Sequence, residues 1–223
     1  NAYASDTISA FGGVIACNYK INKKIALEIN KNFLEVILAK GFDKDSLEIL
    51  KRKKNLRIID ISNFKIRNLT TLKSFDGSFL IQNKDNIVFD KKKLRCVTKL
   101  KPSKKEIAEM QFAFNICKHV KSNAIVLCNN FSTIGIGAGQ PSRLDSCKIA
   151  VQKAKNFQSS KIKNSIAASD AFFPFTDGIY ALIKAGVKTI IQPGGSIRDQ
   201  EVINVANKAK IKMLFTGVRH FNH

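Results

Sequence analysis

Residues 164–199 read NSIAASDAFFPFTDGIYALIKAGVKTIIQPGGSIRD, and the fold class can be inferred from these residues. Its two short apolar runs, 165–168 and 189–192, have the length of buried strands. Between them we expect a helix from Asp177 to Gly186, because glycine commonly follows the last turn of a helix. A strand, a helix and a second strand in this order are typical of a sheet sandwiched between helices. The stretch therefore predicts an α/β fold.

The same alternation continues on both sides of this stretch. A capping box formed by Ser103 and Glu106 predicts a helix that runs to about residue 119. A hairpin is expected next, with a turn at Asn129 and Asn130. Its strands cover 124–128 and 133–137, and the other expected elements are a helix over 141–157, a helix that begins near 196–199 and a strand over 211–215.

The N-terminal part has a separate series of elements. We expect a strand at 14–16, a helix at 24–34, a buried strand at 35–39 and a helix at 44–53. The middle of the chain differs, since short β-like runs at 56–61, 78–82, 86–89 and 94–99 alternate with polar turns. The sequence thus predicts three parts: the end of a first α/β unit at 1–55, an extended β-rich connector at 56–99 and a second α/β unit at 100–223.

The net charge of +21, from 38 basic and 17 acidic residues, raises the question of nucleic-acid binding. Only seven of the basic residues are arginine, the residue that phosphate and base recognition favours. The lysines are spread over the whole chain, which favours solvated lysine faces that also attract anionic substrates. A basic nucleic-acid-binding α/β module remains the alternative function.

The composition also restricts the class of protein. No apolar run reaches 18 residues, so we expect no membrane-spanning segment. The five cysteines form no C-x-x-C pair, which favours reduced thiols in a cytoplasmic protein. Neither H-x-E, H-E-x-x-H nor P-C-x-x-C occurs, so zinc chemistry has no support in the sequence.

Four segments place polar residues or glycines at expected strand ends, where open α/β sheets bind ligands. They are 118–123, 135–143, 169–177 and 192–196. The glycines of 135–139 are equally consistent with a tight turn and with a ligand cradle. The aromatic run 172–175 is either core or a lid over a flat ring. Two of the three histidines lie in 218–223, where a frayed tail is the usual outcome.

Taken together, these segments resemble the bacterial bifunctional family of aminoimidazole carboxamide ribonucleotide (AICAR) formyltransferase and IMP cyclohydrolase. The resemblance covers nearly the whole chain and loosens only at 56–93. The matching strings are KHVKSNAIV (118–126), GIGAGQ-x-SR (135–143), SDAFFPF-x-DG (169–178), IQPGGSIRD (191–199) and FTGVRHF-x-H (215–223), with shorter matches at 6–13 and 35–37.

The resemblance implies a three-layer α/β/α fold made of cytidine-deaminase-like units without zinc. It also implies de novo purine biosynthesis, in which the formyl group of the co-substrate 10-formyltetrahydrofolate is transferred to the 5-amino group of AICAR. A separate cyclohydrolase domain of the family then closes the ring to give IMP. Members of the family are homodimers whose active sites lie at the subunit interface, so AICAR, folate and a second subunit are the implied partners, without nucleic acid or membrane.

The family's ligand-binding residues can be carried over position by position. The implied nucleotide-binding residues are Gly12, Glu35, Asn123, Arg143, Phe172, Arg219 and His223. The implied folate-binding residues are Ile8, Phe11, Leu144, Pro174, Phe175 and Ser196. A monovalent cation such as K⁺ is implied near Ser122 and Asp170.

The chain departs from the family at the catalytic pair. The family places a Lys-His pair within a Lys-His-x-Asn/Ser-Pro segment before the turn that corresponds to residues 10–13. Lys118 and His119 lack the following proline and align with a different family segment. We therefore expect the chain to be a C-terminal part of the transformylase, to contain no catalytic residue of its own and to be inactive alone.

Overall fold

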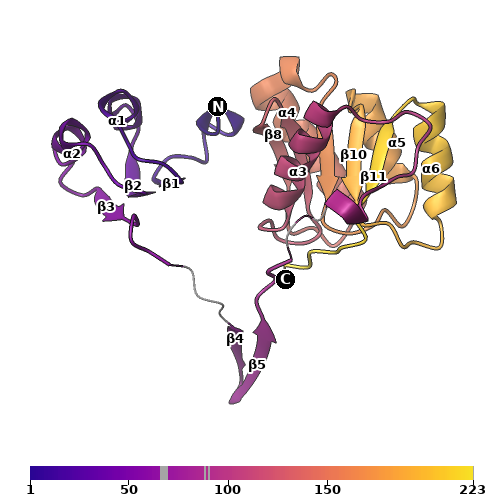
Figure 1. Ribbon diagram of the computed structural model, residues 1–223, viewed down its shortest axis with the longest axis horizontal. Coiled ribbons are helices and arrows are strands. Elements are labelled where there is room, and N and C mark those ends of the chain that lie inside the picture. The colour runs from indigo at the N-terminus through magenta and orange to yellow at the C-terminus, as the bar shows by residue number, and fades with distance from the viewer. Residues whose placement is uncertain (66–69, 88, 90, 223) are drawn as a thin grey trace. The chain divides into compact units, whose positions relative to one another are not determined.

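A computed structural model of the protein describes residues 1–65, 70–87, 89 and 91–222. The chain divides into two compact units. The larger unit comprises residues 1–6 and 85–223, and the smaller unit comprises residues 7–84. Figure 1 shows the helices and strands of both. In the described part of the chain, no helix has the length and apolar character needed to cross a bilayer.

The larger unit is built on a sheet whose strands lie in the order β6-β11-β10-β9-β7-β8. These strands are β6 (Arg95–Cys96), β7 (Ile125–Asn129), β8 (Ser132–Gly137), β9 (Ile166–Ser169), β10 (Thr189–Gln192) and β11 (Lys212–Phe215). Strands β9, β10 and β11 are parallel, whereas β7 is antiparallel to β8 and β9, and β6 is antiparallel to β11. The strands predicted in 164–199 and the predicted hairpin are confirmed.

The helices of the larger unit begin and end at residues that suit helix termini. The predicted capping box is confirmed, because Ser103 Oγ accepts from the Glu106 backbone and the Glu106 carboxylate accepts from the Ser103 backbone. Helix α5 ends before Gly186, which has a φ of 102° that favours glycine. The described helices are α3 (Lys104–Cys117), α4 (Arg143–Gln158), α5 (Asp177–Ala185) and α6 (Asp199–Lys208), with single 3₁₀ turns η1 (Tyr3–Ser5), η2 (Lys91–Lys93) and η3 (Ser159–Lys161).

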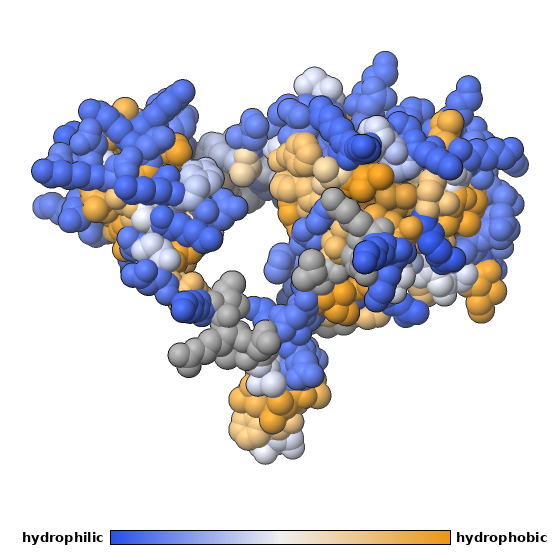
Figure 2. Space-filling view, in the orientation of Figure 1, coloured by the Kyte–Doolittle hydropathy of each residue, from blue (hydrophilic) through white to orange (hydrophobic). Residues whose placement is uncertain are grey.

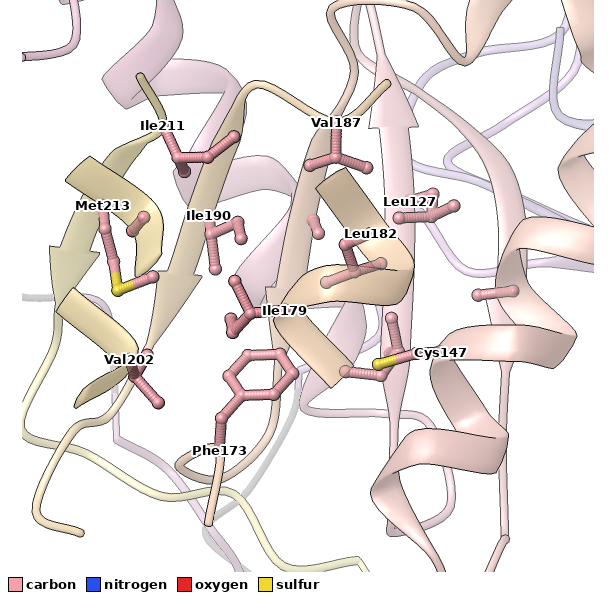
Figure 3. Packing of buried hydrophobic residues seen from close by; sticks show 14 of the residues in the cluster. Leu127, Cys147, Phe173, Ile179, Leu182, Val187, Ile190, Val202, Ile211 and Met213 are labelled. Carbon is pink, nitrogen blue, oxygen red and sulfur yellow. The ribbon is translucent and has the colours of Figure 1, made fainter. Parts of the chain in front are cut away.

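Alternate residues of the strands face opposite sides of this sheet, and each side has its own core. Leu127 and Ile190 pack with side chains of α4, α5 and α6, including Leu182 of α5 (Figure 3). Val126 and Leu214 point to the other side, where they pack with side chains of α3. Helices therefore cover both faces of the sheet, and the predicted α/β class is confirmed.

Two glycines allow α4 to lie close against β8, the outermost strand of the sheet. A Cβ atom at Gly137 would overlap the carbonyl oxygen of Ser146, and one at Gly135 would overlap that of Ala150. Both glycines lie within the strand, as predicted for 133–137, so neither is part of a tight turn. The turn follows the strand and includes Gly139, whose φ is 65°.

The smaller unit contains a parallel sheet with its strands in the order β1-β2-β3. Its elements are β1 (Gly13–Cys17), α1 (Lys23–Asn30), β2 (Leu34–Ala39), α2 (Lys44–Leu50) and β3 (Arg57–Asp60). Helix α1 ends earlier than the predicted residue 34, because the Lys31 amide closes the last turn on the Glu28 carbonyl. Leu34 belongs instead to β2, where it is buried.

A two-stranded hairpin follows, with strands β4 (Thr70–Phe75) and β5 (Ser78–Asn83) joined at Asp76 and Gly77. Only β5 was expected from the sequence. The large apolar side chains of the hairpin are about half exposed or more, and they form the apolar surface visible in Figure 2: Leu72, Phe75, Phe79, Leu80 and Ile81. The β-like run expected at 86–89 is not a strand at 86, 87 and 89, and Val88 lies outside the described residues.

Candidate functional site

The four segments singled out in the sequence meet at one edge of the larger sheet. Ile125 at the start of β7 pairs with Gly137 at the end of β8 and with Ser169 at the end of β9. Gln192 at the end of β10 pairs with Phe215 at the end of β11. Because β7 runs antiparallel to its neighbours, its start lies beside their ends. This edge is therefore the candidate site.

A buried ion pair occupies this edge. Arg143 is 8% exposed, and its Nη1 donates to Asp170 Oδ1 at 2.5 Å and to Ser169 Oγ at 2.8 Å. Its Nη2 donates to Asn123 Oδ1 at 2.7 Å. The carboxylate of Asp170 is fully buried, and its Oδ2 accepts from Ser122 Oγ at 2.6 Å. The guanidinium and the buried carboxylate thus satisfy each other.

This ion pair bears on the monovalent cation expected near Ser122 and Asp170. Both oxygens of Asp170 already accept hydrogen bonds, and Arg143 balances the charge of the carboxylate. This donor set does not favour a cation beside Asp170. Among the residues that the structure describes, no group of three or more His, Cys, Asp or Glu side chains is arranged to hold a metal ion.

A pocket of about 450 Å³ opens beside the ion pair. Its walls include the first residues of α4 and of α5, so the N-termini of two helices face the same space. Helix N-termini carry unpaired N–H groups and partial positive charge, which suits an anionic or carbonyl group of a ligand. The lining residues are Asn123, Pro141, Ser142, Arg143, Leu144, Ala171, Phe172, Phe173, Pro174, Phe175, Asp177, Gly178 and Phe221.

The aromatic run 172–175 is divided between the core and the pocket. Phe173 is 1% exposed and belongs to the core, as Figure 3 shows. Phe172 and Phe175 line the pocket, and each carries an arginine on its ring. The guanidinium of Arg219 lies 5.0 Å from the centroid of Phe172, and that of Arg198 lies 4.9 Å from the centroid of Phe175. The pocket therefore has aromatic walls with cationic groups beside them.

The segment 216–222 crosses the same edge of the sheet. The amide of Thr216 donates to the Gln192 carbonyl, and that of His220 donates to the Asp170 carbonyl. The side chain of His220 is 4% exposed and lies beside Asp85, so the expectation of a frayed tail is wrong for this residue. His223, the other expected tail histidine, lies outside the described residues. No local pattern could have linked His220 with a residue 135 positions away.

Comparison with known proteins supports the resemblance seen in the sequence. A family model described as AICARFT/IMPCHase bienzyme matches residues 1–153.

The chain belongs to this family.

Its relatives include bifunctional purine biosynthesis proteins PurH from two bacteria. The protein from Bartonella bacilliformis is 48% identical over 231 residues, and that from Aquifex aeolicus is 45% identical over 222 residues. Each match covers 100% of this chain and 43% of the relative. The chain thus spans less than half the length of these relatives.

The AICARFT/IMPCHase residues carried over from the resemblance do not all lie in one unit. Gly12 and Glu35, expected at the nucleotide, lie in the smaller unit, as do Ile8 and Phe11, expected at the folate. Ile8 and Phe11 are 76% and 77% exposed, and the Phe11 ring lies 4.9 Å from that of Phe33. Gly12 has a φ of 69°.

The other carried-over residues that the structure describes lie in the larger unit. Asn123, Arg143, Leu144, Phe172, Pro174 and Phe175 line the pocket. The guanidinium of Arg219 lies over the ring of Phe172 in a cation–π contact. Ser196 does not line the pocket, and its hydroxyl accepts from the Arg198 amide in the loop after β10.

Neither Lys118 nor His119 lines the pocket of this family member. Lys118 Nζ donates to the Ile87 carbonyl instead, at 3.1 Å. The thiols of Cys117, Cys128 and Cys147 are also unsuited to nucleophilic chemistry, because burial raises the pKa of each, that of Cys147 to about 12. The described lining of the pocket consequently offers shape and charge for binding, but no lysine, histidine or activated thiol for catalysis.

Proposed function

We propose that this chain takes part in de novo purine biosynthesis as part of an AICAR formyltransferase. The reaction transfers the formyl group of 10-formyltetrahydrofolate to the 5-amino group of AICAR and gives formyl-AICAR. The observation that carries the proposal is the pocket of about 450 Å³ between two helix N-termini, with Arg219 on the ring of Phe172. Such a pocket suits a flat ring that carries an anionic group. The names of the PurH relatives support the pathway.

Each carried-over residue would have a distinct role at the nucleotide. Phe172 would stack against the base, and Arg219 would pair with the 5′-phosphate through its planar fork. Asn123 and Arg143 would hold the carboxamide, a role supported by their fixed positions beside the pocket. The other nucleotide-binding residues of the proposal are Gly12, Glu35 and His223.

The folate would bind at the same edge of the sheet. Leu144, Pro174 and Phe175 line the pocket that also contains Phe172, which supports adjoining binding sites for the two substrates. Ile8, Phe11 and Ser196 complete the proposed folate set. A monovalent cation such as K⁺ near Ser122 and Asp170 is left out of the proposal, because Arg143 already neutralises the Asp170 carboxylate.

The resemblance assigns the catalytic chemistry to a Lys-His pair, and the described lining of the pocket has neither lysine nor histidine. The 5-amino group of AICAR is a poor nucleophile, because its lone pair is delocalised into the ring and the carboxamide. Its attack on the formyl group needs a base for the amine proton and a donor for the developing oxyanion. We assign binding and orientation of the substrates to residues 1–223, and we expect these residues alone not to catalyse formyl transfer.

The proposal extends to architecture and location. Residues 1–55 would be the end of a first cytidine-deaminase-like unit, and residues 100–223 would form a second such unit. Residues 56–99 would be the connector between the two. The sheet with helices on both faces supports that topology for the second unit. The protein would be cytoplasmic. Cyclisation of formyl-AICAR to IMP, the second activity of this bifunctional family, would take place in a separate domain.

We include a homodimer in the proposal, and the β4–β5 hairpin supports it. A two-stranded hairpin with large exposed apolar side chains is marginal in water unless another surface covers it. Phe79→Lys should therefore reduce the dimer fraction measured by analytical ultracentrifugation, whereas Lys73→Gln on the same hairpin should not. An unchanged dimer fraction in Phe79→Lys would remove the hairpin from the interface.

Binding can be tested with two matched arginine variants. In the whole chain encoded by the gene, Arg219→Gln should weaken AICAR binding by about tenfold or more, because a charge-assisted contact to phosphate is lost. Arg198→Gln, which removes the equivalent stack on Phe175, should leave AICAR binding unchanged. Calorimetry measures both affinities. Wild-type affinity in Arg219→Gln would contradict the assignment of Arg219 to the phosphate.

A second experiment tests catalysis. Purified residues 1–223 should bind AICAR more weakly than the whole chain encoded by the gene and should release no tetrahydrofolate, since loss of a base and a donor costs a hundredfold or more in rate. Turnover within about tenfold of the whole chain would show that the catalytic groups lie within residues 1–223.

A further inference from the structure

His220 is a buried polar side chain to which the proposed chemistry gives no role. It is 4% exposed, and its Nδ1 lies 2.6 Å from Asp85 Oδ2. An ionised carboxylate only accepts hydrogen bonds, so Nδ1 is the donor. The imidazole also packs on Phe114 of α3, with ring centroids 4.8 Å apart. The histidine is therefore fixed by one hydrogen bond and one ring contact.

Asp85 is held in turn by its own surroundings. Its Oδ1 accepts from the Ile87 amide at 3.1 Å and lies 3.5 Å from Lys118 Nζ. Partial burial raises the pKa of Asp85, but the hydrogen bonds from His220 and Ile87 and the nearby charges of His220 and Lys118 outweigh it. The net pKa of Asp85 is below its usual value, so the carboxylate is ionised near neutral pH.

The neighbours of His220 in the chain belong to the candidate site. Arg219 stands on the ring of Phe172, and Phe221 lines the pocket. The His220 amide donates to the Asp170 carbonyl at 2.9 Å, which anchors the backbone at the ion pair. His220 is buried, whereas Arg219 and Phe221 on either side are exposed. Because the residues on either side of 220 are its direct neighbours in the chain, a side chain fixed at 220 restricts where 219 and 221 can point.

We propose that the His220–Asp85 pair is a positioning latch for the pocket. It holds the segment 216–222 so that Arg219 faces the ligand, and it acts on the ligand's phosphate through Arg219. His220 touches no substrate and is a positioning residue. The identity of the ligand as a ribonucleotide rests on the proposed function, whereas the ordering of the segment does not.

Three single variants in the whole chain encoded by the gene separate the hydrogen bond from the ring contact. His220→Phe keeps an aromatic ring against Phe114 and loses the donor, and Asp85→Ala loses the acceptor. Both should raise the Kd for AICAR by about tenfold, because Arg219 and its segment must then be ordered when the ligand binds. His220→Asn places an amide donor near the position of Nδ1, and it should stay within about threefold of wild type. The double variant His220→Phe/Asp85→Ala should bind AICAR no more weakly than either of its single variants.

Two controls identify the route through Arg219. In an Arg219→Gln background, His220→Phe should cause no further loss of AICAR affinity. The dephosphorylated nucleoside of AICAR should bind His220→Phe no more weakly than it binds wild type. A loss for nucleotide and nucleoside alike, or an additive loss in the Arg219→Gln background, would overturn the latch, because either result means a general disturbance of the pocket.

Amide hydrogen exchange of residues 216–222 provides a readout that needs no ligand. His220→Phe and Asp85→Ala should increase exchange in this segment, and His220→Asn should restore protection. Unchanged exchange in His220→Phe would overturn the latch. If wild type fails to bind AICAR but the exchange pattern holds, the proposed function fails and the latch stands.

Discussion

Arg143→Met tests how much the buried ion pair contributes to stability. The guanidinium donates to Asn123, Ser169 and Asp170, and methionine fills a similar volume without donating anything. The carboxylate of Asp170 is fully buried, so the variant leaves it without a counter-charge. Removal of one partner from a buried pair costs about 3–5 kcal/mol. We expect the free energy of unfolding to fall by about 4 kcal/mol, the middle of that range.

Urea unfolding near neutral pH measures this change, and two further variants control it. Arg143→Lys keeps the charge but loses the planar fork, so its loss should be intermediate, about 1–3 kcal/mol. The double variant Arg143→Met/Asp170→Asn removes both charges, and it should be more stable than Arg143→Met alone. A loss below about 1 kcal/mol in Arg143→Met would refute the reasoning, because a buried unpaired carboxylate cannot be that well tolerated.

Three more predictions concern pH, packing and charge. Partial burial raises the pKa of Glu106, but hydrogen bonds from Lys212 and the helix cap outweigh it and leave that pKa lowered. Glu106→Gln should therefore lose about 1 kcal/mol near neutral pH, and urea titrations should show this difference vanish as pH falls through the lowered pKa. Gly137→Ala should lower the melting temperature far more than Gly77→Ala, since only the first adds a Cβ into backbone atoms; equal shifts would contradict close packing there. Duplex DNA binding, followed by fluorescence anisotropy, should be weak and fall steeply with salt; tight, sequence-dependent binding at physiological salt would favour the nucleic-acid alternative.

The regular elements of the larger unit could be predicted because their signals are local. The strand at 189–192 has the predicted bounds, and the capping box of α3 has its two predicted hydrogen bonds. The hairpin turn falls one residue later than predicted, at Asn130 and Phe131, which have φ values of 51° and 54°. A phenylalanine rarely adopts this conformation, so its presence in the turn could not be expected from residue preferences.

Other features were missed for two different reasons. Strand β4 (Thr70–Phe75) had an available signal, since Asp76-Gly77 is a strong hairpin turn and the segment on each side is compatible with a strand. For the contacts of the candidate site, by contrast, no local signal was available. Asn123, Arg143 and Asp170 could be expected at one sheet edge, but nothing local indicates that they bind one another. Hydrogen bonds between residues far apart in the chain depend on how the whole sheet closes.

The stacking of Arg219 on Phe172 also affects which ligands the pocket selects. A flat ligand that uses the same face of Phe172 competes with the guanidinium for that face. Breaking such a cation–π contact costs about 0.5–1 kcal/mol at an exposed position. A neutral ring that displaces Arg219 gives the guanidinium no new partner, whereas a ring that carries a phosphate gives it a new and stronger one. The ligand-free protein thus holds a contact that such a ligand must break, and this contact disfavours neutral flat rings relative to flat rings that carry a phosphate.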